Sequence, residues 1–473
     1  MNTLTATRQF MHRRLPLILT IYILIQPLLD VLTNFGAEAG HSLTAGTVVR
    51  ALFLVFAFLY TLFSENFEGK KLCLIAQGAL TAYLLLFMIY MFSLGGVSLC
   101  VANVKELVKV FFAPYVIIFL YTVYRQIGYL VSTRTIAITG GIYAGVILFA
   151  YLTGTSGVSY GNSGYGFKGW FYAANEVSCV IALTAPVLIY YCLKQIPTIT
   201  KKTWWKGVLI ALAFIALVFS ANFLATKIIF GITLIYCLAA FVWSLVRAVQ
   251  TRSRGMIWRF VVSAVLVVLI ALFYLSSPLR GYSDNIYVEM AHKDSELVAI
   301  SLGLEVQKAS AGTWLRSFLD VEGSFMAKLD WLLSRRLLTS ASSLQVYLDG
   351  GLLAKLLGIG YANAPSYTRS VEFMIEMDPF ALLVRHGILG FALYFVPYLV
   401  SIVYAIVQFF KHPVKRLMSL KYCSYLYSAL AAFGISIIAG HALVSPGVSI
   451  FVLVVALSLW VQTQEQNRAL KAA

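Results

Sequence analysis

The sequence predicts an all-α polytopic membrane protein, and three observations support this fold class. Of its 473 residues, 60% are hydrophobic and only 12% are charged. The mean hydropathy is +0.84, outside the range of soluble domains. Apolar stretches of about 17 to 25 residues, the length that crosses a bilayer as a helix, recur along the whole chain. We therefore expect a single integral membrane domain over residues 1–473.

The apolar stretches define about twelve transmembrane helices. We place them at roughly 16–33, 47–63, 72–94, 105–124, 134–153, 174–193, 206–221, 223–246, 257–276, 379–409, 419–440 and 444–462. The first lacks a small-residue cleavage site, so we expect a retained helix rather than a signal peptide. All six cysteines lie within or beside these stretches without C-x-x-C spacing, which predicts neither a disulfide framework nor a zinc site.

Basic residues set the expected orientation. They gather in every second connection, at 8–14, 70–71, 125–134, 194–206, 247–259, 411–421 and 468–471. Under the positive-inside rule these segments are cytoplasmic, which places both termini inside the cell. The formal net charge of +17 is then a topology signal, with anionic membrane lipid as its neighbour. It gives no support to nucleic acid binding.

One long polar segment, 277–378, separates the ninth and tenth expected helices and falls outside the cell. It carries nine basic and twelve acidic residues, a net charge of −3. The runs at 295–320 and 325–351 show apolar residues at helical spacing, and the second ends at Gly350 and Gly351. We expect a large extracytoplasmic loop of helices that caps the bundle.

Ionisable residues within or beside the apolar stretches lie at one depth. All fall near the expected outer ends of their helices: Asp30, Arg50, Lys105, Glu106, Lys109, Lys168, Glu176, Lys227, Arg385 and His386. Each has a structural explanation, because lysine and arginine can snorkel to headgroups and Glu106 can pair with Lys105 or Lys109. Taken together, they predict a polar chamber that opens to the outer leaflet.

The residue types in this chamber suit a sugar carried on a membrane diphosphate. Arginine binds phosphate in bidentate fashion and lysine supplies a point charge. A carboxylate or histidine nearby can take the proton of an acceptor hydroxyl. This chemistry needs no metal and no cofactor.

Several segments resemble the O-antigen ligase and O-antigen polymerase superfamily of bacterial membrane glycosyltransferases. "LLGIGYANAPSY" (356–367), followed by "MDPFALLVRHGILGFALYF" (377–395), resembles that family's Gly-x-Gly segment and glycine-entry helix. "LSRRLLTSASSLQVYLDGG" (333–351) is similar to its Ser-x-Arg helix. "GYGFKGWFYAANEVSCVIAL" (164–183) resembles its Gly-x-Phe...Asn segment, and "ANFLATKIIFG" (221–231) resembles its Thr-(x)-Arg/Lys segment, in which the middle residue is optional.

The resemblance implies a membrane enzyme that joins polyprenyl-diphosphate-linked oligosaccharide repeat units on the outer face of the cytoplasmic membrane. Flippase and chain-length regulator proteins are its implied partners. One departure concerns the place before the glycine-entry helix, where lipopolysaccharide ligases carry a His-Asn pair. Here it reads "EMDP" (376–379), so the mechanism and acceptor of those ligases do not carry over directly.

We expect the candidate site residues to have three different roles. The candidate bases are Asp378, Glu376 and His386, with Asp378 favoured because Pro379 starts the helix beside it. The candidates that hold the diphosphate are Arg336, Lys227, Arg335, Arg316 and Lys168, and those that bind the rest of the substrate are Asn175, Glu176 and Arg385.

Two rival functions remain open at this point. A ligase of the same superfamily would transfer finished glycan to a different acceptor. A flippase or transporter belongs to another class, and such folds often show repeated halves. We find no such repeat, and the long loop lies outside the cell and off the centre of the chain.

Overall fold

The computed structural model describes residues 3–41, 43–160, 165–281, 336–362 and 375–472. The first half of the chain holds α1 (Thr3–Leu24), α2 (Gln26–Glu38), α3 (Ala45–Phe63), α4 (Lys70–Ile127), α5 (Thr133–Leu152), β1 (Gly157–Tyr160), β2 (Tyr165–Gly169) and α6 (Ala174–Gln195). The second half holds α7 (Trp204–Phe223), α8 (Lys227–Thr251), α9 (Arg254–Leu275), α13 (Arg336–Asp349), α14 (Leu352–Leu357), α15 (Asp378–Lys411), α16 (Pro413–Leu417), α17 (Leu420–Ile438) and α18 (Pro446–Ala472). Two short 3-10 turns, Ile196–Thr198 and Lys201–Thr203, join α6 to α7.

The structure confirms a multi-pass helical membrane protein. Among the described residues, nine helices are long and apolar enough to cross a membrane, or ten if the bent pair α1–α2 is one span. Each of the expected apolar stretches coincides with helices of the structure to within a few residues, and the first is divided between α1 and α2. The expected number of crossings remains a prediction.

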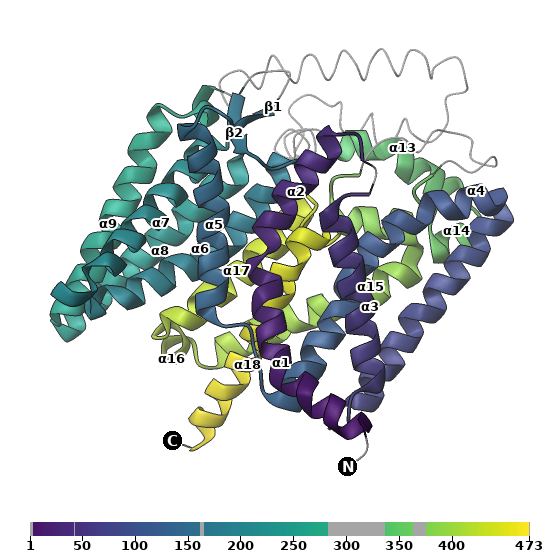
Figure 1. Cartoon of the computed structure of the whole chain (residues 1–473), viewed down its shortest axis with the longest axis horizontal. Coiled ribbons are helices and arrows are strands. Elements are labelled where there is room, and N and C mark those ends of the chain that lie inside the picture. Colours follow the sequence, from purple (N-terminus) through teal and green to yellow (C-terminus); the bar gives the residue numbers. More distant parts are fainter. Residues whose placement is uncertain (1–2, 42, 161–164, 282–335, 363–374, 473) are drawn as a thin grey trace.

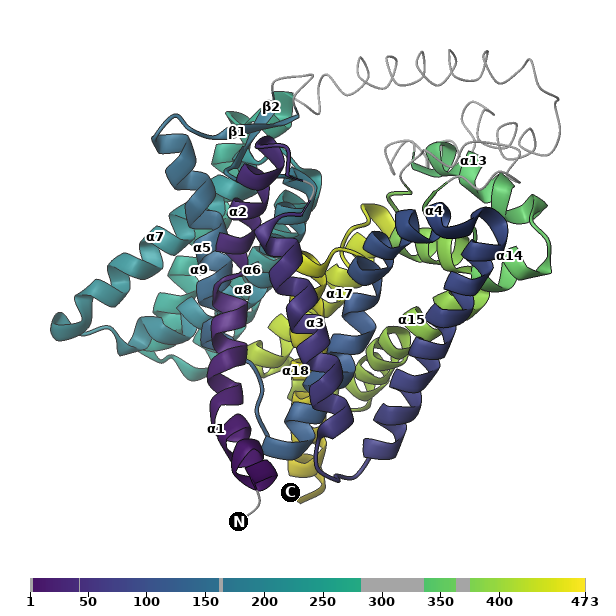
Figure 2. The same cartoon turned by 45° about the vertical axis from the view of Figure 1, so that its right-hand side comes forward.

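Two helical stretches are interrupted at proline or glycine residues. The 47° bend between α1 and α2 comes just before Pro27, which has no N–H to continue the ladder. α4 has 58 residues, about 87 Å of helix, far more than one bilayer crossing. Gly95 and Gly96 interrupt it, and the two arms diverge from this break (Figure 2). The expected helices 72–94 and 105–124 are these two arms.

Both chain termini lie at one end of the bundle, and the β1–β2 hairpin and α13 lie at the other (Figure 1). We call the second end the hairpin end. Its assignment to the outside of the cell follows from the positive-inside rule and stays a prediction. The hairpin was not expected from the sequence. It is antiparallel, with Gly157 opposite Gly169 and Tyr160 opposite Tyr165.

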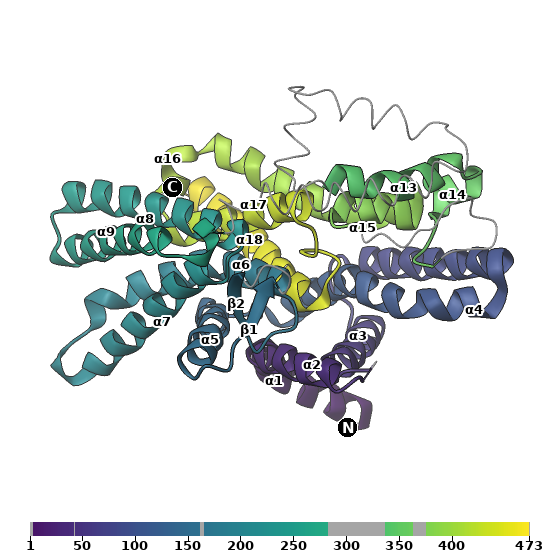
Figure 3. The same cartoon turned by 90° about the horizontal axis from the view of Figure 1, so that it is seen from above.

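The centre of the bundle is formed by α6 and α18, whose spans are the most buried in the described structure. Viewed from above, other helices surround them (Figure 3). The part of α6 and of α18 that can cross the membrane is apolar on nearly all faces, as expected of a helix buried by protein on every side. By contrast, α4 exposes Leu85, Leu86 and Ile89, which suits contact with lipid tails.

The expected outer segment is described in part. The run 295–320 lies outside the described residues, as does the first part of 325–351. The rest of the second run is α13, which ends at Asp349 immediately before Gly350 and Gly351. The predicted helix stop is therefore confirmed.

Candidate functional site

The two glycine motifs near the start of α15 form one structural unit. α15 is interrupted at Gly387, which has φ 63° and ψ −175°. A Cβ atom there would lie 2.4 Å from the Leu356 carbonyl oxygen, so only glycine fits. The interruption turns the carbonyls of Val384 and Arg385 toward the Gly-x-Gly segment. Ile359 and Gly360 donate their backbone N–H groups to these two carbonyls, at 3.1 Å each.

Arg385 holds this unit together from inside. Its Nη1 donates to the Gly360 carbonyl at 2.8 Å, and its guanidinium lies 5.5 Å from the centre of the Tyr361 ring. The Tyr361 N–H donates in turn to Asn103 Oδ1 at 2.7 Å. Arg385 is 6% exposed. The predicted substrate-binding residue thus lies in the interior and holds the Gly-x-Gly segment to α15, whereas the Tyr361 N–H joins that segment to α4.

His386 is also an interior residue. It is fully buried, with the rings of Phe87 and Phe111 at 5.5 and 5.1 Å between centroids. Its Nε2 is hydrogen-bonded to the Tyr361 hydroxyl at 2.8 Å. The Tyr83 hydroxyl donates to the His386 carbonyl at 2.8 Å. These contacts enclose the histidine that the sequence offered as a base.

Asp378, the favoured base, begins α15 and is 1% exposed. Its Oδ1 accepts a hydrogen bond from the His441 N–H at 2.6 Å, and its Oδ2 accepts one from the Leu443 N–H at 2.7 Å. Both oxygens are therefore bonded to the backbone between α17 and α18. This geometry favours a structural role for Asp378, which ties the start of α15 to that loop.

Glu376 and Arg336 form an ion pair at the hairpin end. Arg336 Nε lies 2.5 Å from Glu376 Oε2, and the side chains are 15% and 37% exposed. Arg336 Nη1 also donates to the Ile438 carbonyl at the end of α17, at 2.7 Å. Two residues predicted for different roles, one to hold the diphosphate and one to act as base, are thus in direct contact. Of the two predicted carboxylates, Glu376 is the one that can meet a substrate.

The first turn of α6 lies close to this ion pair. Asn175 and Glu176 are half-buried there. The charges that act on the Cys179 thiol, one turn further along α6, are those of Asp378, Glu176 and Arg336. The predicted sugar-binding residues are thus near Asp378 and Arg336.

The two predicted lysines lie on the hairpin and on α8. Lys168, in β2, donates from Nζ to the Tyr172 carbonyl at 2.8 Å. The hairpin packs on the turn before α8, because a Cβ atom at Gly166 would lie 2.7 Å from the Ala225 Cβ. Lys227 is the first residue of α8. From above, α8 lies on one side of α6 and α15 on the other (Figure 3). Arg335 and Arg316 lie outside the described residues.

Other ionisable residues from the predicted chamber are paired with each other. Arg50 contacts Asp30 at 2.5 Å, and the Tyr143 hydroxyl donates to the other Asp30 oxygen at 2.5 Å. Lys109 contacts Glu106 at 2.7 Å, which is one of the two pairings that the sequence suggested for Glu106. The first pair joins α2, α3 and α5, and nothing in the sequence indicates that Tyr143 completes it.

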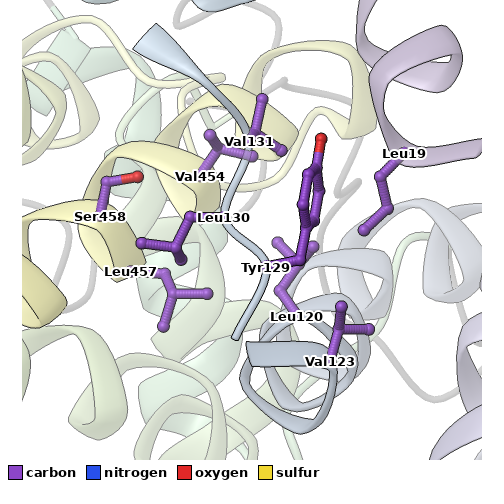
Figure 4. A pocket seen from close by; sticks show the side chains of 9 residues that line it. All are labelled: Leu19, Leu120, Val123, Tyr129, Leu130, Val131, Val454, Leu457 and Ser458. Atoms are coloured by element: carbon purple, nitrogen blue, oxygen red, sulfur yellow. The ribbon is translucent and has the colours of Figure 1, made fainter. Parts of the chain in front are cut away.

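A small apolar cavity lies toward the end that holds both termini. It measures about 10 Å³ and is lined by residues of α1, α4 and α18 and by the segment 129–131 (Figure 4). A cavity of this size holds at most one water molecule, and no predicted site residue lines it. Over the part of the chain that the structure describes, no group of three or more His, Cys, Asp or Glu side chains is arranged to hold a metal.

The comparison with protein families covers nearly the whole chain. A family model described as "O-antigen ligase like membrane protein" matches residues 13–466. No curated protein matches the chain.

Proposed function

Because the chain belongs to the family of O-antigen ligase like membrane proteins, we propose that it polymerises lipid-linked oligosaccharides. Family membership makes it a membrane enzyme of glycan processing. In our proposal it joins repeat units carried on a polyprenyl diphosphate, at the outer face of the cytoplasmic membrane. The flippase and chain-length regulator proteins named above are its proposed partners.

The contact between Arg336 and Glu376 carries this proposal. It places a cation and a partly exposed carboxylate together at the hairpin end. Transfer from a diphosphate carrier needs both groups, one to stabilise the leaving diphosphate and one to receive a proton. Arg336 is fixed from two sides by Glu376 and the Ile438 carbonyl, which limits the reorganisation needed when the diphosphate leaves.

The proposed reaction is a single displacement. The acceptor hydroxyl attacks the anomeric carbon of the donor sugar, a new glycosidic bond forms, and the bond to the diphosphate oxygen breaks. The diphosphate leaves with that electron pair, and Glu376 takes the proton of the hydroxyl. The step as written uses no metal ion and no cofactor.

The other site residues take supporting roles in this proposal. Lys227 and Lys168 add positive charge for the diphosphate on the α8 side of α6. Asn175 and Glu176, on the first turn of α6, bind sugar hydroxyls. Arg335 and Arg316 stay candidates for the diphosphate.

Variants of the ion pair test the site. The substrate is the lipid-linked oligosaccharide extracted from cells in which the gene has been deleted, because the proposal predicts that such cells accumulate it. In reconstituted vesicles, Glu376→Gln should slow transfer about 100-fold to 10,000-fold, the usual contribution of a general base. Arg336→Ala should be as severe, and Arg336→Lys should keep part of the activity because it retains the charge.

Glu106→Gln is the matched control for these variants. It also removes a carboxylate from an ion pair, with 34% side-chain exposure against 37% for Glu376. We expect it to transfer at the wild-type rate. Full transfer by both Glu376→Gln and Arg336→Ala would exclude the proposed site.

A further inference from the structure

The loop 439–445, between α17 and α18, contains a strained histidine. Gly440 has φ +67° and His441 has φ +60°, so two consecutive residues adopt the left-handed conformation. Glycine adopts it readily, whereas residues with a side chain rarely do. Strain of this kind persists only where the surroundings impose it, and it is often found at functional sites.

The surroundings that impose it are the residues at the start of α15. The Asp378 carboxylate accepts the N–H groups of His441 and Leu443. Gly440 packs so closely on the Glu376 backbone that a Cβ atom there would lie 1.4 Å from the Glu376 carbonyl oxygen. At the other side of the loop, the Tyr394 hydroxyl donates to the Leu443 carbonyl at 2.7 Å. The loop is therefore held in one conformation.

This conformation places residue 441 beside the residues of the ion pair. His441 is half-buried, and its N–H donates to the carboxylate of Asp378, two residues after Glu376. Arg336 is bonded to the carbonyl of Ile438, three residues before His441. The loop around His441 is thus bonded to Asp378 and Arg336 and packs on the Glu376 backbone. Within the described part of the chain, neither nitrogen of the His441 ring forms a hydrogen bond.

We propose that His441 is a further residue of the transfer site and that its ring hydrogen-bonds a hydroxyl of the acceptor sugar beside Glu376. This inference rests on the proposed function. Asp378 is then a positioning residue, because it acts on the substrate only through the loop that it holds. The backbone strain at His441 is the cost of directing an imidazole toward the acceptor.

The substitution His441→Gly tests the role of the imidazole ring separately from the stability of the fold. His441→Gly removes the imidazole and also relieves the left-handed strain, so the melting temperature should stay the same or rise. We expect kcat/KM for the extracted lipid-linked oligosaccharide to fall about tenfold or more, mainly through KM, as expected for one lost hydrogen bond. His441→Asn should recover most of this loss, because asparagine tolerates the left-handed conformation and carries hydrogen-bonding groups.

The control is Arg252→Gly. Arg252 is also left-handed, with φ 48° at the end of α8, and the same substitution there should leave transfer unchanged. Wild-type kcat/KM in His441→Gly would overturn the inference, as would a fall that comes with lost thermal stability. If Glu376→Gln and Arg336→Ala abolish transfer in the same assay, only the inference about His441 fails. If they too transfer normally, Arg336 and Glu376 are not the site of transfer, and the proposed function fails with the inference.

Discussion

Replacing Gly387 by alanine tests whether the two glycine motifs form one unit. The added Cβ atom would lie 2.4 Å from the Leu356 carbonyl oxygen and 2.6 Å from the Gly358 nitrogen. It would also sit at φ +63°, where a residue with a side chain costs about 1–2 kcal/mol. To avoid the contact, the Gly-x-Gly segment must move away from α15.

The size of the effect follows from the bonds that this movement breaks. The Ile359–Val384 and Gly360–Arg385 hydrogen bonds join the two segments, and a buried donor left without a partner costs about 1–3 kcal/mol. Adding the backbone term gives a loss of about 3–8 kcal/mol in the free energy of unfolding. This is a large part of the stability of a typical protein, about 5–15 kcal/mol.

The assay is thermal unfolding in detergent, followed by transfer in vesicles. The control is Gly434→Ala on α17, where an added Cβ meets nothing within 4 Å. Alanine favours the helix there by about 1 kcal/mol, so this variant should unfold at the same temperature or slightly higher. If Gly387→Ala unfolds within a degree or two of Gly434→Ala, the Gly-x-Gly segment and α15 do not stabilise each other.

Three further predictions concern the surroundings of the site. Asp378→Asn exchanges one acceptor oxygen for an NH₂ group that faces a backbone N–H, so it should lower the unfolding free energy by about 1–3 kcal/mol; unchanged thermal unfolding would contradict the hydrogen bonds assigned to Asp378. Arg50→Met leaves the Asp30 charge without its partner and should cost about 3–5 kcal/mol, most of which Asp30→Asn in the same chain should restore; equal stability of the single and double variants would argue against the pair. Burial raises the pKa of Tyr361, so its contribution to stability is fully present below the unfolded pKa of about 10 and is lost above it. Stability between about pH 10 and 11 should therefore fall less steeply in Tyr361→Phe than in the wild type, and equal slopes in circular dichroism melts would contradict this.

The membrane fold could be predicted because the bilayer imposes it locally. A crossing helix must be apolar over about 20 residues, so α6, α18 and the arms of α4 can be recognised without knowing their neighbours. The break in α4 at Gly95 and Gly96 follows from the same constraint on length. The hairpin could not be recognised this way, because its strands have four and five residues and are rich in glycine.

The sequence indicated which residues gather at the candidate site better than it indicated how they are arranged there. The sequence indicated that Glu376, Asp378 and Arg336 belong to one region, and the structure joins Arg336 to Glu376. It could not indicate which carboxylate would be buried, because the N–H groups that bind Asp378 belong to residues 63 and 65 positions later in the chain. His386 was misleading for a similar reason, since the aromatic rings that enclose it come from α4.

His441 was not among the predicted site residues, although the sequence contains a feature that could have indicated it. It is an ionisable residue in the last expected outer turn, next to Gly440 and a few residues before Pro446. Its importance depends on the left-handed backbone and on Asp378, and neither can be read from the local sequence. Similarly, Tyr143 lies within an apolar helix, and its bond to Asp30 depends on how α5 packs on α2.

The central claim is that this protein polymerises lipid-linked repeat units at the site of Arg336 and Glu376. The most direct test gives the purified protein, in vesicles, only the lipid-linked oligosaccharide from deletion-strain cells, and separates the products by length. We predict a ladder of products that each differ by one repeat unit, absent with Glu376→Gln and present with Glu106→Gln. A single addition that requires a second acceptor would instead indicate a ligase, and movement of the lipid across the membrane without any new glycosidic bond would indicate a flippase.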